Sequence, residues 1–462
     1  MQNPEKAAIV LAAGLGTRMK SDKSKLLHEL CGKTFITHIV SKLENLVDEI
    51  VVIVGNSKDE VIDEVKKTCP NFIDRITFVD QEEMLGTGHA VKVGLSFLSE
   101  SIKDVIVVLG DMPLITEQVL SEIFNTYSQS NMHLLVSTAL LENPYGYGRI
   151  LRDENNIVSR IIEEKDCDEN LRNINECNMF PFVFKKEFID FAIDKLDTNN
   201  SQGELYLTDI VEIARQSFKG VTSYSYKDIR IAQSANDRYQ LSKLEKIMRE
   251  NINQKHMENG VTIIDPNNTY VDDDVVIEND VTLLPGTYLQ GKTVISKGCI
   301  IGPNTRIIDS EISENCIIES SKIVESKIGN AATIGPFASL RAGCQLQDNV
   351  HVGTSVELKK STVGKGTKIP HLSYIGDATI GENANLGAGT TTANYDGKNK
   401  HQTVIGNNVK TGVNTVLVAP VSLGDGAYTG AGAVVVKDVP SGALAKGVPA
   451  TNDDDWIAPS DR

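Results

Sequence analysis

The segment LAAGLGTRMKSDKSK (residues 11–25) places two glycines, an arginine and several lysines directly after the apolar run 7–10. Glycines let a backbone approach a ligand closely, and Arg18 and Lys25 supply two cations for a polyphosphate. The segment is not a Walker loop, and it lacks the third glycine of the dinucleotide fingerprint. A tight turn with two solvated cations therefore remains an alternative interpretation of these residues.

Asp111 is a second residue suited to phosphate chemistry. It follows Gly110 at the end of the apolar run 105–109, which predicts a buried strand. A carboxylate at this point can hold Mg²⁺ against the phosphates of a nucleotide, while water and substrate oxygens complete the coordination. Taken alone, an aspartate that opens a turn before Pro113 is the simpler interpretation.

His371 is the candidate base of the carboxyl-terminal half, in the segment SVELKKSTVGKGTKIPHLSYIGD (residues 355–377). A histidine can act as general base for an amine that attacks a thioester. A packed or solvated histidine is the alternative.

The composition restricts the class of protein. A chain of 462 residues exceeds one ordinary core and predicts two or three domains. The net charge of −16 argues against nucleic-acid or membrane-surface binding, which both need a cationic face. The seven scattered cysteines form no Cys-x-x-Cys pair and are expected to be free thiols. The start MQNPEK has no signal pattern and no apolar run approaches membrane-spanning length, so we expect a cytoplasmic protein.

Short apolar runs alternate with helical patterns up to about residue 230, with the clearest strands at 50–54, 76–79, 105–109 and 134–138. This alternation predicts an α/β, Rossmann-like domain over residues 1–233 with a mostly parallel sheet, whose ligands bind at the carboxyl ends of the strands. Residues 234–260 begin with a Ser-x-x-Asp capping box and end at Gly260, which predicts one long connecting helix.

Residues 261–462 are expected to form the second domain, because from residue 271 to residue 435 aliphatic residues, and a few threonines, recur at sixth positions in several series. This period is typical of a left-handed parallel β-helix built from hexapeptide repeats, and it corresponds to about nine triangular coils. The two longest series are 271, 277, 283, 289, 295, 301, 307 and 328, 334, 340, 346, 352, 358. The stretch TTANYDGKNKH (391–401) abandons the period and predicts a loop that leaves the β-helix, where function often resides.

Six motifs of the first half occur in the order found in sugar-1-phosphate nucleotidyltransferases. They are LAAGLGTRM with Lys25, LGTGHA (85–90), GDMPLI (110–115), YGYGRI (145–150), IIEEKD (161–166) and GELYLTDI (203–210). Joined to a hexapeptide β-helix, nearly the whole chain resembles the bacterial bifunctional N-acetylglucosamine-1-phosphate uridyltransferase/glucosamine-1-phosphate acetyltransferases.

The resemblance implies two reactions. The second half would acetylate glucosamine 1-phosphate with acetyl-CoA, and the first half would transfer UMP from UTP to N-acetylglucosamine 1-phosphate with release of pyrophosphate. It also implies Mg²⁺ as cofactor of the uridyltransferase site and a homotrimer in which each acetyltransferase site forms between subunits.

The resemblance assigns residues of the first half by motif. Arg18 and Lys25 would contact the phosphates, and Asp111 and Asn236 would hold Mg²⁺. The implied substrate contacts comprise Leu11, Ala12, Ala13, Gly14, Gln81, Gly86, Thr87, Leu109 and Gly110 for UTP, and Gly148, Glu163 and Asn178 for the amino sugar. Three neighbours depart from the family pattern: Ser24 stands where proline is usual, Leu109 where tyrosine is common, and Met179-Phe180 where Thr-Gly usually follows Asn178.

In the second half, the resemblance implies that His371 is the base and that Glu357 orients it. The other implied contacts are Arg341, Lys359, Tyr374, Asn385, Asn394 and Tyr395 at the sugar phosphate, and Ala388, Val413, Ala431 and Gly447 along acetyl-CoA. Val413 stands where serine is common, and Gly447 stands where arginine is expected, with Lys446 beside it as a substitute.

Two other functions remain open at this point. One is a single-activity sugar-1-phosphate nucleotidyltransferase whose β-helix is structural, and the other is a scaffold that has lost its chemistry. The presence of Arg18, Lys25, Asp111 and Asn236 argues against the scaffold. His371 and the loop with Asn394 and Tyr395 argue against a purely structural β-helix.

Overall fold

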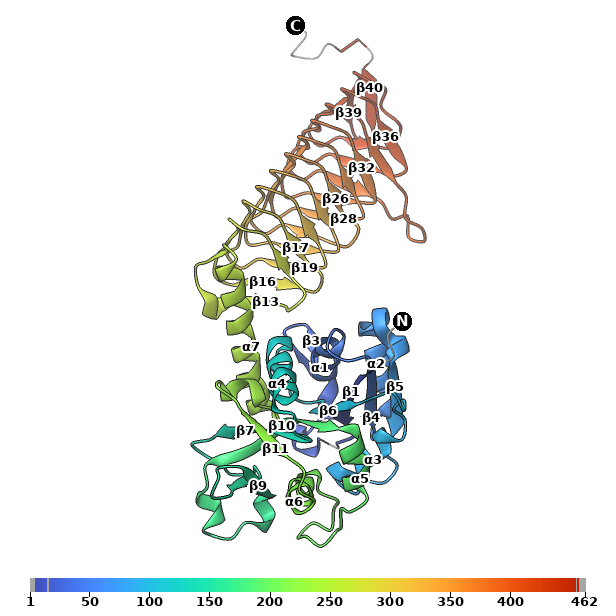
Figure 1. Cartoon of the computed structure of the whole chain (residues 1–462). Coiled ribbons are helices and arrows are strands. Elements are labelled where there is room, and N and C mark those ends of the chain that lie inside the picture. Colours follow the sequence, from blue (N-terminus) through green and yellow to red (C-terminus); the bar gives the residue numbers. More distant parts are fainter. Residues whose placement is uncertain (1–4, 15, 454, 457–462) are drawn as a thin grey trace. The chain divides into compact units, whose positions relative to one another are not determined.

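The computed structural model describes residues 5–14, 16–453 and 455–456, so the first four residues of MQNPEK, on which part of the signal prediction rests, lie outside the described residues. The chain divides into two compact units, Met1–Met248 and Arg249–Arg462 (Figure 1). Within the described residues, no helix combines the length and apolar character needed to cross a membrane.

The first unit contains a mixed sheet with strands on a central path in the order β11-β7-β10-β6-β1-β4-β5. The bounds are β1 (Lys6–Ala12), β4 (Glu49–Val54), β5 (Ile76–Asp80), β6 (Asp104–Leu109), β7 (Leu134–Leu140), β10 (Glu176–Lys185) and β11 (Val221–Ser225). The four runs read as strands from the sequence are confirmed. The sheet is parallel along this path except at β10, which runs antiparallel to both of its neighbours. Shorter strands are β2 (Glu29–Leu30), β3 (Lys33–Thr34), β8 (Arg149–Arg152) and β9 (Val158–Ile162).

Helices cover both faces of this sheet, because the alternating residues of its strands are apolar on both sides. In β1, Ala8 and Val10 pack into one core and Ala7 and Ile9 into the other. The first core includes residues of α1 (Phe35–Leu43), α2 (Lys58–Thr68) and α4 (Glu117–Ser130), and the second includes residues of α3 (Thr87–Leu95), α5 (Lys186–Ile193) and α6 (Ile210–Gln216).

The long helix predicted over 234–260 is present as α7 (Arg238–Glu258), but its predicted start is wrong by four residues. The cap is Asp237 instead of Ser234: the Asp237 carboxylate accepts the backbone N–H of Gln240 at 2.7 Å. Residues 229–232 form a separate 3-10 turn, which keeps Ser234 outside the helix. Gly260 follows the helix end with a φ of 92°, as expected for a glycine stop.

The second unit forms three long parallel sheets, one for each face of the predicted β-helix. The first has β12 (Thr262–Ile263), β15 (Thr282–Leu283), β18 (Ile300–Ile301), β21 (Ile317–Ile318), β24 (Thr333–Ile334), β27 (His351–Thr354) and β30 (Lys368–His371). The second has β13 (Thr269–Val271), β16 (Thr287–Gln290), β19 (Arg306–Ile308), β22 (Lys322–Val324), β25 (Ser339–Leu340), β28 (Glu357–Lys359), β31 (Tyr374–Gly376), β33 (Thr391–Ala393), β35 (Val416–Val418) and β38 (Val434–Val435). The third has β14 (Val276–Ile277), β17 (Val294–Ile295), β20 (Glu311–Ile312), β23 (Lys327–Ile328), β26 (Gln345–Leu346), β29 (Thr362–Val363), β32 (Ala378–Ile380), β34 (Thr403–Ile405) and β36 (Val421–Leu423). A small sheet of β37 (Tyr428–Thr429), β39 (Leu444–Gly447) and β40 (Ala450–Asp453) ends the unit.

The residues at the predicted sixth positions form the core of this unit, which confirms the period. The period is interrupted between Ile307 and Ile328, where the inward residues are Ile312, Ile318 and Ile323, at most 1% exposed. Their spacing includes steps of five residues, because some coils turn one residue earlier.

The break in the period near residue 391 is confirmed, although its predicted start is wrong by three residues. Thr391, Thr392 and Ala393 remain in β33 and pair with β35. The chain leaves the sheet at Asn394, and Tyr395 and Lys400 form an isolated antiparallel bridge within the loop. The loop returns to the β-helix at Thr403, the first residue of β34.

Candidate functional site

A cavity of about 470 Å³ lies in the first unit where β1 and β6 end. This is the edge of the sheet at which the sequence predicts a ligand. Twelve of the predicted positions line the cavity, namely Leu11, Ala12, Ala13, Gly14, Arg18, Lys25, Gln81, Gly86, Thr87, Leu109, Asp111 and Asn236.

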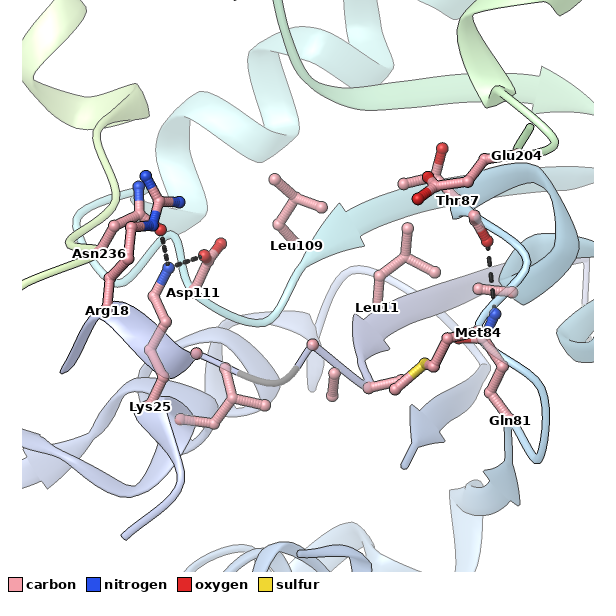
Figure 2. A pocket seen from close by; sticks show the side chains of 17 residues that line it. Leu11, Arg18, Lys25, Gln81, Met84, Thr87, Leu109, Asp111, Glu204 and Asn236 are labelled. Atoms are coloured by element: carbon pink, nitrogen blue, oxygen red, sulfur yellow. Dashed lines mark hydrogen bonds and ion pairs between the residues drawn. The ribbon is translucent and has the colours of Figure 1, made fainter. Parts of the chain in front are cut away.

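The charged end of the cavity is organised around Lys25 (Figure 2). Its buried ammonium pairs with one carboxylate oxygen of Asp111 and donates to Oδ1 of Asn236 at 2.7 Å. The second carboxylate oxygen of Asp111 is buried and has no hydrogen-bond partner within the described chain. Asp111 and Asn236 thus each direct one side-chain oxygen at the Lys25 ammonium, and a further Asp111 oxygen has no partner among the residues described. Such a set of oxygens fits the coordination of Mg²⁺.

The sequence around these groups explains their positions. Asp111 follows β6, and Lys25 begins a 3-10 turn (Lys25–Leu27) that packs against Gly16. A Cβ at Gly16 would lie 2.7 Å from that of Lys25, and the Gly16 φ of 57° also favours glycine. Asn236 immediately precedes the α7 cap, and its backbone N–H donates to the Gln240 side chain at 2.7 Å.

The opposite end of the cavity is less charged. Gln81, Met84, Thr87 and Leu11 lie there, away from Arg18 and Lys25, and the Glu204 side chain lies beside Thr87 (Figure 2). The cavity therefore has two cations at one end, and an amide, apolar side chains and one carboxylate at the other.

Gly16, one of the two glycines noted in the segment 11–25, also lines the cavity. Four further lining residues had no predicted role: Leu26, Met84, Ala90 and Glu204. Glu204 and Met84 come from loops, where no periodic pattern marks a residue. A signal for Glu204 was its place in the motif GELYLTDI. Gly110 packs beneath the cavity instead of lining it, and its backbone N–H donates to the Leu11 carbonyl at 2.9 Å.

The three predicted amino-sugar residues form a second group outside the lining of this cavity. Asn178 donates its backbone N–H to the Gly148 carbonyl at 2.8 Å, and a Cβ on Gly148 would lie 3.5 Å from a carboxylate oxygen of Glu163. Burial raises the pKa of Glu163, although a hydrogen bond from Thr208 at 2.8 Å opposes this shift. The Asn178 side-chain oxygen is buried without a partner among the residues described. This group is suited to a ligand rich in hydroxyl groups.

In the second unit, His371 ends β30 and is exposed. Glu357 pairs in register with Tyr374, and its carboxylate accepts from Arg341 at 3.2 Å. The described chain contains no hydrogen bond between Glu357 and His371, so the predicted orienting contact stays a prediction.

Polar groups gather where the 394–402 loop leaves β33. The Asn394 side-chain amide donates to Asp377, and the Lys359 ammonium lies 3.7 Å from the same carboxylate. The Asn394 amide and the Tyr374 hydroxyl both approach Gly376, where a Cβ would lie within 2.7 Å of either and would displace these side chains. These side chains make a polar cluster beside the loop.

Lys400 is a cation of this cluster that sequence reasoning missed. The adjacent Lys359 ammonium lowers the pKa of Lys400. Two neighbouring ammonium groups are suited to a phosphate. Tyr395 is 59% exposed, and its hydroxyl donates within the loop to the Gly397 carbonyl at 2.6 Å.

The predicted acetyl-CoA positions follow one corner of the β-helix. Ala388 accepts from Asn414 at 2.7 Å, and Val413 accepts from Gly432 at 2.8 Å, which places 388, 413 and 431 on successive coils. Asn385 bridges the strands at Lys368 and Lys410. Gly447 lies at the end of β39 with a φ of 96°, and Lys446 beside it is paired with Asp453 at 2.8 Å.

Comparison with known proteins gives matches to both units. Residues 8–158 match the MobA-like NTP transferase domain, residues 301–388 the GlmU-like C-terminal hexapeptide, and residues 402–437 the bacterial transferase hexapeptide (six repeats). The chain is 44% identical to the bifunctional protein GlmU of Clostridium novyi over 441 residues, which is 95% of each chain. It is also 44% identical to the protein of the same name from Clostridium tetani, over 98% of this chain and 99% of that one.

Proposed function

Because the chain belongs to the family of bifunctional GlmU proteins, we propose that it carries out the two reactions of UDP-N-acetylglucosamine synthesis at the two clusters described above. The chain is a bifunctional nucleotidyltransferase and acetyltransferase that acts on sugar phosphates with a nucleotide and acetyl-CoA. Residues 1–233 would hold the uridyltransferase, residues 261–462 the acetyltransferase, and 234–260 the connecting helix.

One observation carries the uridyltransferase assignment: Lys25, Asp111 and Asn236 converge at the charged end of the cavity. A phosphate oxygen of N-acetylglucosamine 1-phosphate attacks the α-phosphorus of UTP, and the bond to pyrophosphate breaks. The nucleophile is already an anion, so the chain needs no strong base. Arg18 and Lys25 neutralise charge as the phosphates approach one another.

Mg²⁺ fits this site because Asp111 and Asn236 present oxygens to one point and one Asp111 oxygen lacks a partner. When bound, the metal would neutralise phosphate charge and orient the leaving pyrophosphate. Gly148, Glu163 and Asn178 would hold the sugar, with Glu163 accepting hydrogen bonds from its hydroxyl or amide groups.

Acetyl transfer is assigned to the cluster around His371. The amine of glucosamine 1-phosphate attacks the thioester carbonyl, the carbon–sulfur bond breaks, and His371 takes the proton from the nitrogen. Lys359 and Lys400 would bind the sugar phosphate, with Asn394 and Tyr374 at its hydroxyl groups. The corner with residues 388, 413 and 431 supports an extended ligand such as acetyl-CoA.

We also propose that the chain is a homotrimer. Ile300 and Ile317 are paired in register on adjacent strands and are 41% and 47% exposed. Apolar side chains stacked on an outer face favour burial against a second copy. Equilibrium sedimentation is expected to give three times the chain mass, and a monomer would contradict the proposal.

One assay tests the two reactions together. Purified protein is incubated with glucosamine 1-phosphate, acetyl-CoA, UTP and Mg²⁺, while free thiol and pyrophosphate are measured separately. We expect thiol release without UTP, and pyrophosphate release that depends on prior acetylation. Pyrophosphate from supplied N-acetylglucosamine 1-phosphate with no thiol release would instead support the single-activity nucleotidyltransferase.

A further inference from the structure

The Gln81 side chain at the less charged end of the cavity is held in one orientation. Gln81 is only 5% exposed, and its backbone N–H donates to the Val54 carbonyl at 2.8 Å. Its amide nitrogen lies 3.3 Å from the Gly86 carbonyl oxygen and 3.2 Å from Nδ1 of His89 (Figure 2 shows the first bond). Both neighbours therefore contact the same atom of the amide.

The identity of that atom follows from the chemistry of its partners. A backbone carbonyl only accepts hydrogen bonds, so the amide atom that faces Gly86 must be the NH₂ group. Because this nitrogen only donates, Nδ1 of His89 accepts and the imidazole proton resides on Nε2. The two hydrogens of the Gln81 amide are then both used, and Oε1 is the one polar atom of the amide left for a ligand.

The Gly86 carbonyl is itself held in place. Gly86 has a φ of 105°, and a Cβ there would lie 2.7 Å from the Leu205 carbonyl oxygen, so the position favours glycine. The 3.3 Å bond to this carbonyl is long, and it restrains rotation of the amide only weakly. His89 supplies the second restraint, from within α3.

We infer that His89 is a positioning residue that selects uracil over cytosine, by holding Gln81 with its oxygen toward the base. The inference rests on the proposed uridyltransferase function, in which the phosphates take the charged end of the cavity and the base takes the end with Gln81. Uracil carries a donor at N3, which an amide oxygen accepts. Cytosine carries a bare acceptor at N3, which that oxygen repels.

Two substitutions whose side chains resemble each other in shape separate the effect of the hydrogen bond from the effect of losing the imidazole ring. His89→Asn keeps an acceptor on Cγ, where Nδ1 is attached, and His89→Leu places a methyl group there. In the leucine variant one amide hydrogen of Gln81 loses its partner, and the amide turns to offer NH₂ to cytosine N3. The ratio of kcat/KM for UTP to that for CTP should fall at least about tenfold in His89→Leu and stay within about threefold in His89→Asn.

The kinetic constants distinguish positioning from general damage. The base lies at the far end of the cavity from the reacting phosphorus, so His89→Leu should raise KM for UTP and change kcat by less than about twofold. KM for N-acetylglucosamine 1-phosphate should be unchanged. In a Gln81→Ala background, His89→Leu should have no further effect on nucleotide selectivity, because its action passes through Gln81.

Retained selectivity in His89→Leu, an equal loss in His89→Asn, or an undiminished effect in the Gln81→Ala background would each overturn the inference. Failure of the parent protein to release pyrophosphate from UTP would instead overturn the proposed function. Pyrophosphate release by the parent protein is therefore measured first. The UTP-to-CTP ratio of kcat/KM in the variants then tests the role of His89.

Discussion

At the scale of single residues, the Lys25 ammonium occupies the point between Asp111 and Asn236 where the proposed Mg²⁺ ligands meet. A divalent ion and an ammonium cannot share that point, so Lys25 would turn toward the phosphates if Asp111 and Asn236 held the proposed Mg²⁺. The same residue would then balance Asp111 before the substrate binds and neutralise phosphate charge afterwards. This dual use explains why a buried lysine is tolerated here.

Asp111→Asn is expected to lower pyrophosphate release at least about a hundredfold, because the amide keeps the shape of the side chain and loses the charge that holds the metal. Thiol release from acetyl-CoA should stay within about twofold, since that site lies in the other unit. Both products are measured in the same sample. Comparable loss of both activities in a folded protein would contradict the assignment of the two reactions to separate sites.

Glu163→Gln is expected to stabilise the protein near pH 7.5 and to weaken sugar binding. Burial raises the folded pKa of Glu163 above its ordinary value. Between the unfolded and the folded pKa, the folded state therefore holds a proton that the unfolded state has lost. The contribution of Glu163 to stability therefore declines as pH rises through that window and stays low above it.

Glutamine removes this pH-dependent cost and can still accept from Thr208. We expect Tm to rise by about 2–4 °C at pH 7.5, with a smaller change near pH 4.5, as measured by differential scanning calorimetry. KM for N-acetylglucosamine 1-phosphate should increase at least about tenfold. An unchanged KM would remove Glu163 from the sugar site, whatever the change in stability.

His371→Ala should lower thiol release at least about a hundredfold, because the protonated amine must lose its proton before it attacks the thioester. His371 is exposed at a strand end, so the fold should persist. Pyrophosphate release from supplied N-acetylglucosamine 1-phosphate serves as the control and should be unchanged. Acetylation at the parental rate would make His371 a surface histidine without a role in proton transfer.

Residues next to strand ends could be predicted from the apolar pattern, whereas loop residues such as Asn394 could be predicted only from a family motif. Asp111 follows an apolar run, so its place at the sheet edge was visible in the pattern. Glu204 and Lys400 reach their clusters through irregular segments, whose paths depend on tertiary contacts. Glu357 was predicted to orient His371, whereas its contact within one chain is with Arg341.

At the scale of elements, α7 links Asn236, a proposed Mg²⁺ ligand, to the rest of the first unit. Arg238 at its start lies 3.3 Å from the His28 ring, and Glu245, about two turns later, accepts the backbone N–H of Cys31 at 3.2 Å. Both contacts reach the short segment that follows Lys25. The helix therefore sets the separation between Lys25 and Asn236.

A fragment of residues 1–230 should be at least about tenfold less active in pyrophosphate release than a fragment of residues 1–260. The shorter fragment lacks Asn236 and the contacts of α7 with His28 and Cys31. Circular dichroism establishes whether each fragment is folded, and the Mg²⁺ concentration for half-maximal activity reports on the metal site. Equal activity and equal Mg²⁺ dependence in two folded fragments would count against Asn236 as a ligand.

Regular elements were predictable to the extent that their period held. The period of six identified the β-helix, but the five-residue steps that place Ile312 and Ile323 inside it follow from turn lengths that the aliphatic pattern does not reveal. Strand β10 was not predicted, because Asn178 and Pro181 interrupt its apolar run and the pairing with β7 shifts register between Met179 and Phe182. Its buried residues 182–184 are apolar, as in any central strand.

At the scale of the whole molecule, a net charge of −16 accompanies substrates that are all anions. The chain attracts these anions with cations placed at each site: Arg18 and Lys25 in the first unit, and Lys359 and Lys400 in the second. Long-range attraction contributes little to binding in such a protein, because salt screens charges beyond about 8 Å. The affinity for each phosphate then depends on short-range contacts. For this reason the proposed phosphate sites are identified by individual Arg and Lys side chains.

An equal mixture of Asp111→Asn and His371→Ala proteins should make UDP-N-acetylglucosamine from glucosamine 1-phosphate, although neither variant should do so alone. Each keeps the site that the other has lost, and the cavity of the first unit is lined by residues of that unit only, within the chain described. The acetylated sugar phosphate can therefore leave one chain and bind another. Pyrophosphate release should show a lag that shortens as protein concentration rises, because the intermediate must first accumulate. If Asp111→Asn still acetylates glucosamine 1-phosphate, His371→Ala still uses supplied N-acetylglucosamine 1-phosphate, and the mixture makes no product, then the intermediate passes between sites without release.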